Sequence, residues 1–483
     1  MCIRRSHLSL EGMSQLKKRL LILTCIFMML SNITIAATTE TIPSPIEPEF
    51  SYASDFSEEG VAMVATGGEW SLELWYDVKG AKYGFIDRSG KFIVEPQYDW
   101  ATAFVEGFGR VEKEKKIGFV DITGREIVKP QYDWVYDFSE GMAAVEKSDK
   151  WGFVDKTGKE IVTPRYNRVD SFSNGIAKVY KNNKSGFIDK TGKEIVTPQY
   201  GSIEPFAGGM AAVYKNGKWG FIDQSGKEVI KPQYNSVGSV GRPEATYFTE
   251  GLALVANDQR DRNPLFIDKT GKVVLKTRYD YAFDFSNGLA LVSKGSKIGF
   301  IDNKGKEVIK PQFTDAQSFN EGMAAIMNKE RKWGFIDKTG KVIVKPQYDN
   351  VFDFQDGIAI VQNGLKRGLI DKTGKVILKP IYEKIKPLHE GLIMIQQSGK
   401  SGIVNRSGSV IVKPKYDDIK NFSEGLAAVE LKGKWGFIDK NGEIIITPQY
   451  AVINDFKNGF ALVQREQWKY HFIANPLHNP NKS

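Results

Sequence analysis

The stretch KWGFIDKTGK, Lys332–Lys341, decides the fold because the chain contains close copies of it. Lys150–Lys159 reads KWGFVDKTGK, Lys184–Lys193 reads KSGFIDKTGK and Lys434–Glu443 reads KWGFIDKNGE. The central glycines are spaced mostly 34 residues apart, at Gly84, Gly118, Gly152, Gly186, Gly220, Gly299, Gly334, Gly368, Gly402 and Gly436, with Leu265 in the glycine's place. Self-similarity at such a period predicts a repeat architecture, and this overrides a domain count based on the length of 483 residues.

Each copy predicts a β-hairpin. Asp337 precedes Gly340 by three positions, and this Asp-x-x-Gly step between two apolar runs is typical of a type I turn capped by the Asp side chain, with its last residue at positive φ. The first strand is then KWGFID and the second KVIVKP. Pro346 and its counterparts are expected to end the second strand, because proline has no N–H to donate to a sheet.

Aromatic residues recur after each hairpin. Tyr348 follows Pro346 by two positions and Phe354 follows Tyr348 by six, whereas Leu388 stands where the next copy should have Phe. A third strand follows, as in GMAAVEK at Gly141–Lys147. One unit would thus be a three-stranded antiparallel meander with an 11-residue return loop, stable only when neighbours cover it.

The predicted fold class is all-β, with about eleven 34-residue meanders stacked in an open β-solenoid or superhelix. A propeller-like ring is the alternative, or two rings divided at the insertion near 235–248. A degraded twelfth copy, WKYHFIANP, ends the array.

The residues carry a resemblance to a known family. KWGFIDKTGK, the following VKPQYD and the F-x-E-G-x-A-A-V segment resemble the bacterial WG-repeat (KWG-repeat) proteins over about Phe56 to Ala474. The resemblance implies a secreted or envelope-associated β-repeat scaffold. It carries no catalytic residue that could be transferred to this chain.

The N-terminal residues predict a secretory signal peptide. Basic residues precede the apolar run Leu20–Ala37, which barely reaches the length needed to span a bilayer, so an uncleaved anchor is the weaker alternative. Cleavage near Ala36 would remove residues 1–36 with both cysteines and lower the net charge from +9 to +5. Met1 and Met13 both qualify as the start. Residues 37–50 would form a Pro/Thr-rich tether, 51–474 the repeat array and 475–483 a C-terminal tail.

These features predict a secreted, periplasmic or envelope protein that meets the membrane only transiently, through its signal peptide. A net charge of +5 is too small for the strongly basic face of a nucleic-acid binder. We expect no cofactor, metal site or catalytic residue, because four scattered histidines and aspartates repeated at turn positions do not form a ligand or acid–base set.

Two sets of residues are candidates for ligand binding. Trp151, Trp219, Trp333 and Trp435 could act as aromatic shelves for a cell-wall glycan, although packing against the strand glycine is the favoured role. Lys338 and Lys341 represent lysines at the hairpin tips, which would form a basic ridge suited to an anionic envelope polymer. Acidic residues at the opposite strand ends, such as Glu106 and Glu140, would form an acidic rim.

The predicted function is therefore a non-enzymatic scaffold that binds a protein or an envelope polymer. Glycan binding through the four tryptophans is the first alternative, and an uncharacterised hydrolase is the second.

Overall fold

The computed structural model describes residues 49–70, 78–238, 247–257, 264–465 and 469–477. The chain divides into residues 1–44 and 45–483, and everything below concerns the second part. The predicted signal peptide, most of the tether and most of the C-terminal tail lie outside the described residues, as does the centre of the insertion. No helix in the described ranges is long and apolar enough to cross a membrane.

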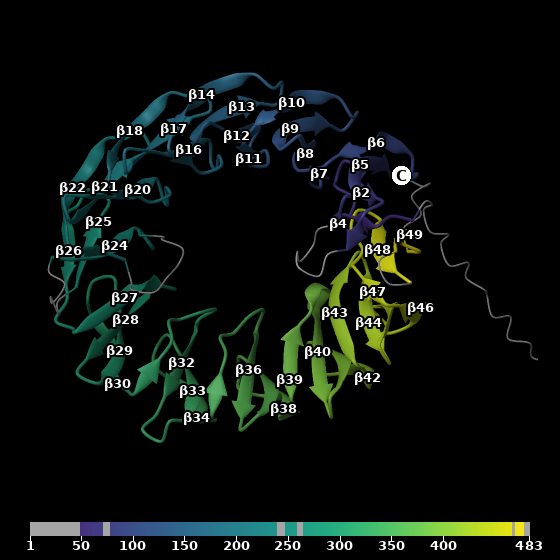
Figure 1. The fold of residues 1–483 in the computed structure, drawn as a ribbon. Helices are drawn as coiled ribbons and strands as arrows, with labels where there is room; N and C mark the ends of the chain where they lie inside the picture. The colour runs from purple at the N-terminus through teal and green to yellow at the C-terminus, as the bar shows by residue number, and fades with distance from the viewer. Residues whose placement is uncertain (1–48, 71–77, 239–246, 258–263, 466–468, 478–483) are drawn as a thin grey trace, which may run out of the picture. The chain divides into compact units, whose positions relative to one another are not determined.

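The chain folds into twelve successive antiparallel sheets, here called blades 1 to 12 (Figure 1). Blades 1 to 4 contain β1 (Tyr52–Ala53), β2 (Val61–Thr66), β5 (Lys82–Asp87) and β6 (Phe92–Tyr98); β7 (Trp100–Ala101), β8 (Phe108–Lys113), β9 (Lys116–Asp121) and β10 (Glu126–Tyr132); β11 (Trp134–Val135), β12 (Met142–Lys147), β13 (Lys150–Asp155) and β14 (Glu160–Tyr166); β15 (Arg168–Val169), β16 (Ile176–Lys181), β17 (Lys184–Asp189) and β18 (Glu194–Tyr200). A two-stranded hairpin of β3 (Glu69–Trp70) and β4 (Val78–Lys79) is inserted in blade 1.

The next four blades follow the same order. They contain β19 (Ser202–Ile203), β20 (Met210–Lys215), β21 (Lys218–Asp223) and β22 (Glu228–Tyr234); β23 (Ser236–Val237), β24 (Leu252–Ala256), β25 (Leu265–Asp268) and β26 (Val273–Lys276); β27 (Tyr281–Ser286), β28 (Leu289–Lys294), β29 (Lys297–Asp302) and β30 (Glu307–Phe313); β31 (Asp315–Ala316), β32 (Met323–Met327), β33 (Trp333–Asp337) and β34 (Val342–Tyr348).

The last four blades follow the same order, except that blade 10 contains a 3-10 turn and blade 12 has three strands. They contain β35 (Asn350–Val351), β36 (Ile358–Asn363), β37 (Lys366–Asp371) and β38 (Val376–Tyr382); β39 (Lys384–Pro387), the 3-10 turn η1 (His389–Gly391), β40 (Leu392–Gln397), β41 (Lys400–Asn405) and β42 (Val410–Tyr416); β43 (Asp418–Ser423), β44 (Leu426–Leu431), β45 (Lys434–Asp439) and β46 (Ile444–Tyr450); and β47 (Val452–Ile453), β48 (Phe460–Gln464) and β49 (Tyr470–Ala474).

Blades 1 to 11 each have four strands rather than the three predicted from the sequence, and blade 12 has three. In blade 3, β11 pairs through Trp134↔Glu146 and Val135↔Val145 with β12, which then pairs with β13. The additional strand lies within the predicted return loop and has only two residues, too few to show a β-periodicity. The blade therefore begins just after the repeated tyrosine, and its first strand lies on the inner side of the ring in Figure 1.

The predicted hairpin turn is confirmed. Gly340 has φ +85°, and its N–H donates to the Asp337 carbonyl at 3.0 Å. The Asp337 carboxylate accepts the N–H of Thr339 at 2.9 Å and of Lys341 at 3.0 Å. The aspartates at this position therefore act as turn caps, as their spacing predicts.

Proline does not end the following strand, contrary to the prediction. β14 continues past Pro164 to Tyr166, and its register against β13 shifts between the pairs Phe153↔Val162 and Trp151↔Tyr166. Proline therefore lies in a bulge on the outermost strand, where a missing N–H breaks no interior ladder.

Aromatic pairs fill the seams between blades. Phe335 of blade 8 packs edge-to-face on Phe354 of blade 9 with the ring centroids 4.8 Å apart. The insertion does not interrupt this pattern, because Phe248 beyond it contacts Phe221 of blade 5 at 5.0 Å. On the outer side, the Tyr166 hydroxyl donates to Glu194 of blade 4 at 2.9 Å.

The first and last blades are joined, which makes the array a ring. Phe50 forms an antiparallel bridge with Tyr470 of β49. In blade 11 the equivalent pair is Tyr450 with Trp435, so Phe50 takes the place of the repeated tyrosine in blade 12. The Asn458 side chain donates to the Phe56 carbonyl at 2.9 Å, and Phe56 packs on Phe472 at 4.6 Å. The open solenoid is therefore wrong and the propeller-like alternative is confirmed, with twelve blades instead of eleven.

The ring is not divided into two at the insertion. Phe221 of blade 5 shares a core cluster with Val255 of blade 6, and Phe266 of blade 6 shares one with Phe285 of blade 7. The contacts between blades thus continue past residues 235–248. The alternative of two smaller rings is wrong for this chain.

Candidate binding surfaces

A two-residue turn precedes the second strand of most blades, and we call it the clamp turn. In blade 3 it consists of Glu140 and Gly141, with φ +52° and +83°, between Ser139 and Met142, whose backbones bond each other. Two positive φ values define a type I′ turn, which normally favours Asn or Gly at its first position. Its first residue has positive φ throughout this set: Glu106, Glu140, Asn174, Gly208, Glu250, Asn287, Glu321, Asp356, Glu424 and Asn458.

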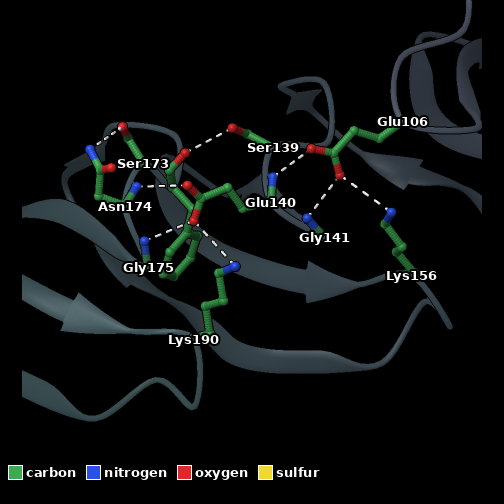
Figure 2. Close-up of polar contacts among 10 residues, drawn as sticks. Glu106, Ser139, Glu140, Gly141, Lys156, Ser173, Asn174, Gly175 and Lys190 are labelled. Atoms are coloured by element: carbon green, nitrogen blue, oxygen red, sulfur yellow. Dashed lines mark hydrogen bonds and ion pairs between the residues drawn. The ribbon is translucent and has the colours of Figure 1, made fainter.

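The glutamates of the clamp turns bind the next blade. Figure 2 shows Glu106 of blade 2 accepting the N–H groups of Glu140 and Gly141 at 2.6 and 2.8 Å, with the Lys156 ammonium at 3.4 Å. Glu140 repeats these contacts one blade further on, with Asn174, Gly175 and Lys190. One carboxylate therefore joins a backbone turn and a hairpin tip of the neighbouring sheet.

Ionisation is favoured at these clamps. The N–H of Gly175, and then the Lys190 ammonium, hold the pKa of Glu140 below its usual value of 4.5. At Glu321 the Lys372 ammonium makes the largest contribution, and the pKa is again lowered. The charged form of each carboxylate is the form that binds the next blade.

The predicted acidic rim opposite a basic ridge is wrong, because both sets lie on one face and pair with each other. In a four-stranded meander the turn between the first two strands lies at the same end as the turn between the last two. Five hairpin-tip cations bind an acid of the preceding blade, four of them at a clamp turn and the fifth at η1: Lys156 to Glu106, Lys190 to Glu140, Lys372 to Glu321, Arg406 to Asp356 and Lys440 to Glu390.

Lys338 and Lys341 are exposed at the hairpin tip of blade 8. The corresponding clamp turn of blade 7 has Asn287 in place of a glutamate. In the described part of the chain, neither lysine side chain has a carboxylate within 4.0 Å. Lys338 is thus an exception to the pairing of its column, and the pair remains a candidate contact for an anion.

The four candidate tryptophans occupy equivalent places on the third strands. Trp151 is only 9% exposed, and Tyr136 stacks on it with the centroids 4.8 Å apart. Trp219, Trp333 and Trp435 are half-buried against core clusters. Each tryptophan packs against the core cluster of its own seam rather than contributing to one common surface, which favours a role in core packing. Ligand binding by them stays a prediction.

Exposed aromatic residues lie instead on the first strands, and sequence reasoning missed them. Trp134 of β11 is 45% exposed and Tyr281 of β27 is 69% exposed, with Phe283 two residues further along the same strand. Phe352, which follows β35, is 41% exposed. The signal in the sequence is an aromatic side chain in the segment between the repeated Tyr and Phe, which is predicted to be a return loop.

Titratable groups do not gather into a further site among the described residues. No group of three His, Cys, Asp or Glu side chains in these ranges has the proximity needed to hold a metal ion. His471 lies 3.7 Å from Glu49, whereas His389 belongs to η1.

Comparison with known proteins gives one decisive result. The WG containing repeat family matches twelve segments: 46–70, 83–116, 117–151, 151–184, 186–219, 219–260, 266–297, 298–331, 333–365, 368–400, 402–435 and 435–467. The chain belongs to the WG-repeat family. Each matched segment contributes to one or two blades of the ring, so the blades are the structural form of the WG repeat. Among curated proteins, none matches the WG-repeat chain significantly.

Solved structures resemble the WG-repeat chain only loosely. BamB from Moraxella catarrhalis is 14% identical, with 57% of this chain and 96% of that chain covered and a TM-score of 0.27. Kluyveromyces lactis Hsv2p is 10% identical, with coverages of 49% and 92% and a TM-score of 0.27. The extracellular domain of the B. thetaiotaomicron hybrid two component system BT3049 is 11% identical, with coverages of 88% and 69% and a TM-score of 0.20. The fold assignment therefore rests on the chain's own sheets and repeats.

Proposed function

We propose that this WG-repeat ring is a non-enzymatic scaffold that binds a protein or an envelope polymer outside the cytoplasm. The observation that supports binding is the exposure of Trp134 and Tyr281 on first strands whose next residues, Val135 and Ala282, are buried. Exposed aromatic side chains held on rigid strands lose little conformational entropy on binding and often dominate interfaces.

Substitution of the two aromatic residues tests this proposal. We expect Trp134→Ala combined with Tyr281→Ala to weaken capture of the ligand by at least 10-fold, using immobilised full-length protein with purified peptidoglycan or solubilised envelope proteins. Val410→Ala is the matched control, because Val410 is 52% exposed on a fourth strand. Equal capture by the double variant and the control would remove these residues from the binding surface.

Cell-wall glycan is the alternative ligand, and aromatic faces also suit sugar rings. Trp219, Trp333 and Trp435 keep part of their surface exposed, which supports their use as shelves more than the enclosed Trp151. Peptidoglycan retention that falls on Trp333→Phe, while retention of envelope proteins does not change, would favour the glycan. Retention unchanged by Trp219→Phe, Trp333→Phe and Trp435→Phe would exclude these tryptophans as shelves.

An anionic polymer such as teichoic acid is the ligand to which Lys338 and Lys341 would contribute. We expect Lys338→Gln with Lys341→Gln to weaken binding and to reduce its salt dependence, because exposed charges are screened within about 8 Å at physiological salt. Lys372→Gln is the control, since Lys372 is already paired with Glu321 at 2.9 Å. Binding that does not change between low and high salt would exclude a polyelectrolyte mode.

Two further parts of the proposal need separate tests. Export predicts a mature N-terminus near residue 37, which N-terminal sequencing of protein from the envelope fraction would reveal. Recovery of the intact N-terminus in the cytoplasm would contradict export.

The absence of catalysis is tested with glycan and peptide substrates. If one acidic substitution abolished turnover, the protein would be an enzyme with a single active site. If the active site were repeated in each blade, one substitution would remove only a fraction of the activity.

A further inference from the structure

The seam between blades 9 and 10 lacks the aromatic pair that fills other seams. Leu369 and Leu388 occupy the positions that Phe335 and Phe354 occupy one blade earlier, and both leucines are buried. Equivalent phenylalanine pairs lie with their centroids 4.9 Å apart at the seams of Phe153 with Phe172 and of Phe300 with Phe319. This seam therefore lacks both of the phenylalanine rings that fill the equivalent space at those seams.

A cavity of about 320 Å³ opens at this seam. Leu369, Leu388, Ile360 and Ile385 give it apolar walls, and the exposed Phe352 stands at its mouth. Its volume is near the lower end of the range for small-molecule sites, roughly 300–1,000 Å³. A ligand with a single aromatic ring suits both the volume and the aliphatic lining.

The charged residues that line the cavity favour a cationic ligand, and the Arg367 guanidinium, which is not part of the lining, lies over the Phe352 ring at 5.5 Å from its centroid. Arg406 is engaged by Asp356 at 2.7 Å, so this ion pair is neutral. Asp353 also lines the cavity, and no hydrogen bond or ion pair to its carboxylate occurs within the described residues. The lining therefore has one carboxylate more than it has cations.

Comparison with blade 3 indicates what Asp353 lacks. Asp137 precedes its phenylalanine as Asp353 precedes Phe354, and Asp137 binds the Arg110 guanidinium of blade 2 at 2.7 Å. At the corresponding place in blade 8 the second strand has Ala325, which supplies no cation. Asp353 is exposed, and its partial desolvation raises the pKa of its carboxyl, as expected for a carboxylate without a counter-ion.

We propose that the seam between blades 9 and 10 is a binding site for a small arylalkylamine, in which a short alkyl chain joins an aromatic ring to an ammonium group. The ring enters the space between Leu369 and Leu388, and the ammonium group pairs with Asp353. Phe352 packs against the exposed side of the ligand. The site is separate from the scaffold's proposed binding surface and does not rest on that function.

Calorimetric titration of the full chain with 2-phenylethylamine tests the site. We expect a dissociation constant on the order of millimolar, typical of so small a ligand. The isosteric anion 3-phenylpropionate should bind at least 10-fold more weakly, because Asp353 repels it. No binding of the amine at tens of millimolar, or equal binding of the anion, would overturn the proposal.

Two substitutions locate the binding. Leu369→Phe with Leu388→Phe restores the pair found at other seams and should abolish amine binding; Leu388→Phe alone serves if the double variant does not fold. Asp353→Asn should weaken the amine about 10-fold and leave neutral 2-phenylethanol unchanged, with Asp149→Asn, an exposed acid in blade 3, as the control. If a folded variant with phenylalanine at the seam bound the amine with unchanged affinity, the amine would bind outside this cavity and the proposal would be overturned.

Discussion

At the scale of single residues, the clamp glutamates combine an unfavourable backbone with a favourable contact. Glu140 has φ +52°, a left-handed conformation that costs a residue with a Cβ about 1–2 kcal/mol. Its carboxylate accepts two N–H groups of the next blade, at 2.6 Å from Asn174 and 2.8 Å from Gly175. We infer that the contact between blades offsets the backbone cost, which explains why glutamate stands where Asn or Gly would suit the turn alone.

Removing one clamp charge should destabilise the ring in a pH-dependent way. Because the pKa of Glu140 is lowered in the folded state, its contribution is present in full above the ordinary value of 4.5 and is lost as the pH falls through the lower folded pKa. We expect Glu140→Gln to lower the melting temperature by about 1–3 °C at pH 7. The difference in melting temperature between the variant and the wild type should shrink as the pH falls below 4.5.

Thermal melts between pH 3 and pH 8 would measure this difference. The control is Glu330→Gln, which removes an exposed glutamate that is not part of a clamp turn. The control should follow the wild type at every pH. A Glu140→Gln deficit that persists unchanged at pH 3 would show that the carboxylate charge is not what holds the blades.

At the scale of the strand, the repeated glycine and the repeated proline belong to one close contact between the third and fourth strands of a blade. The Cβ of an alanine at Gly152 would lie 2.1 Å from the Val162 carbonyl oxygen and 2.7 Å from the Pro164 nitrogen. The bulge of β14 thus brings its backbone against the bare Cα of β13. The repeated glycine is required by this close approach, and the tryptophan beside it is not what covers that backbone.

A single methyl group should therefore disrupt a blade. We expect Gly152→Ala to destabilise the protein by about 3 kcal/mol or more, because the clash is with backbone that cannot move without breaking the bulge. Gly201→Ala is the control, since its Cβ would meet nothing closer than 3.5 Å. Denaturant unfolding would compare the two. A Gly152→Ala variant as stable as Gly201→Ala would contradict the close approach.

The same elements show what the sequence can predict. The turn from Asp337 to Gly340 depends on contacts within five residues, so the spacing of Asp and Gly in the sequence is sufficient to predict it. The strand β11 has two residues and is recognisable only by its pairing with β12. The clamp was missed for a similar reason: nothing local indicates that Glu106 binds the turn of Glu140, which is one repeat away.

At the scale of the whole molecule, closure depends on contacts between the two ends of the array. The sequence gives the packing partner of each blade but not the small angle between neighbours, and that angle decides between a ring and a superhelix. Asn454 binds the Asp55 side chain at 2.9 Å, and Phe50 completes the sheet of blade 12. The signal for closure in the sequence is Phe50, an aromatic residue ahead of the first repeat, but Phe50 falls within the predicted tether.

Phe50 should hold blades 1 and 12 together. Its side chain is 1% exposed and shares a core cluster with Phe472 of β49, so Phe50→Ala should cost about 3–5 kcal/mol at this seam. Hydrogen exchange should then accelerate in both β1–β2 and β47–β49, while blade 6 keeps its protection. Phe319→Ala, a buried phenylalanine at the seam of blades 7 and 8, should instead affect β27–β34. If Phe50→Ala left the β49 amides protected, the remaining contacts of Asn454 and Asn458 would be sufficient for closure, and Phe50 would only fill the core of blade 1.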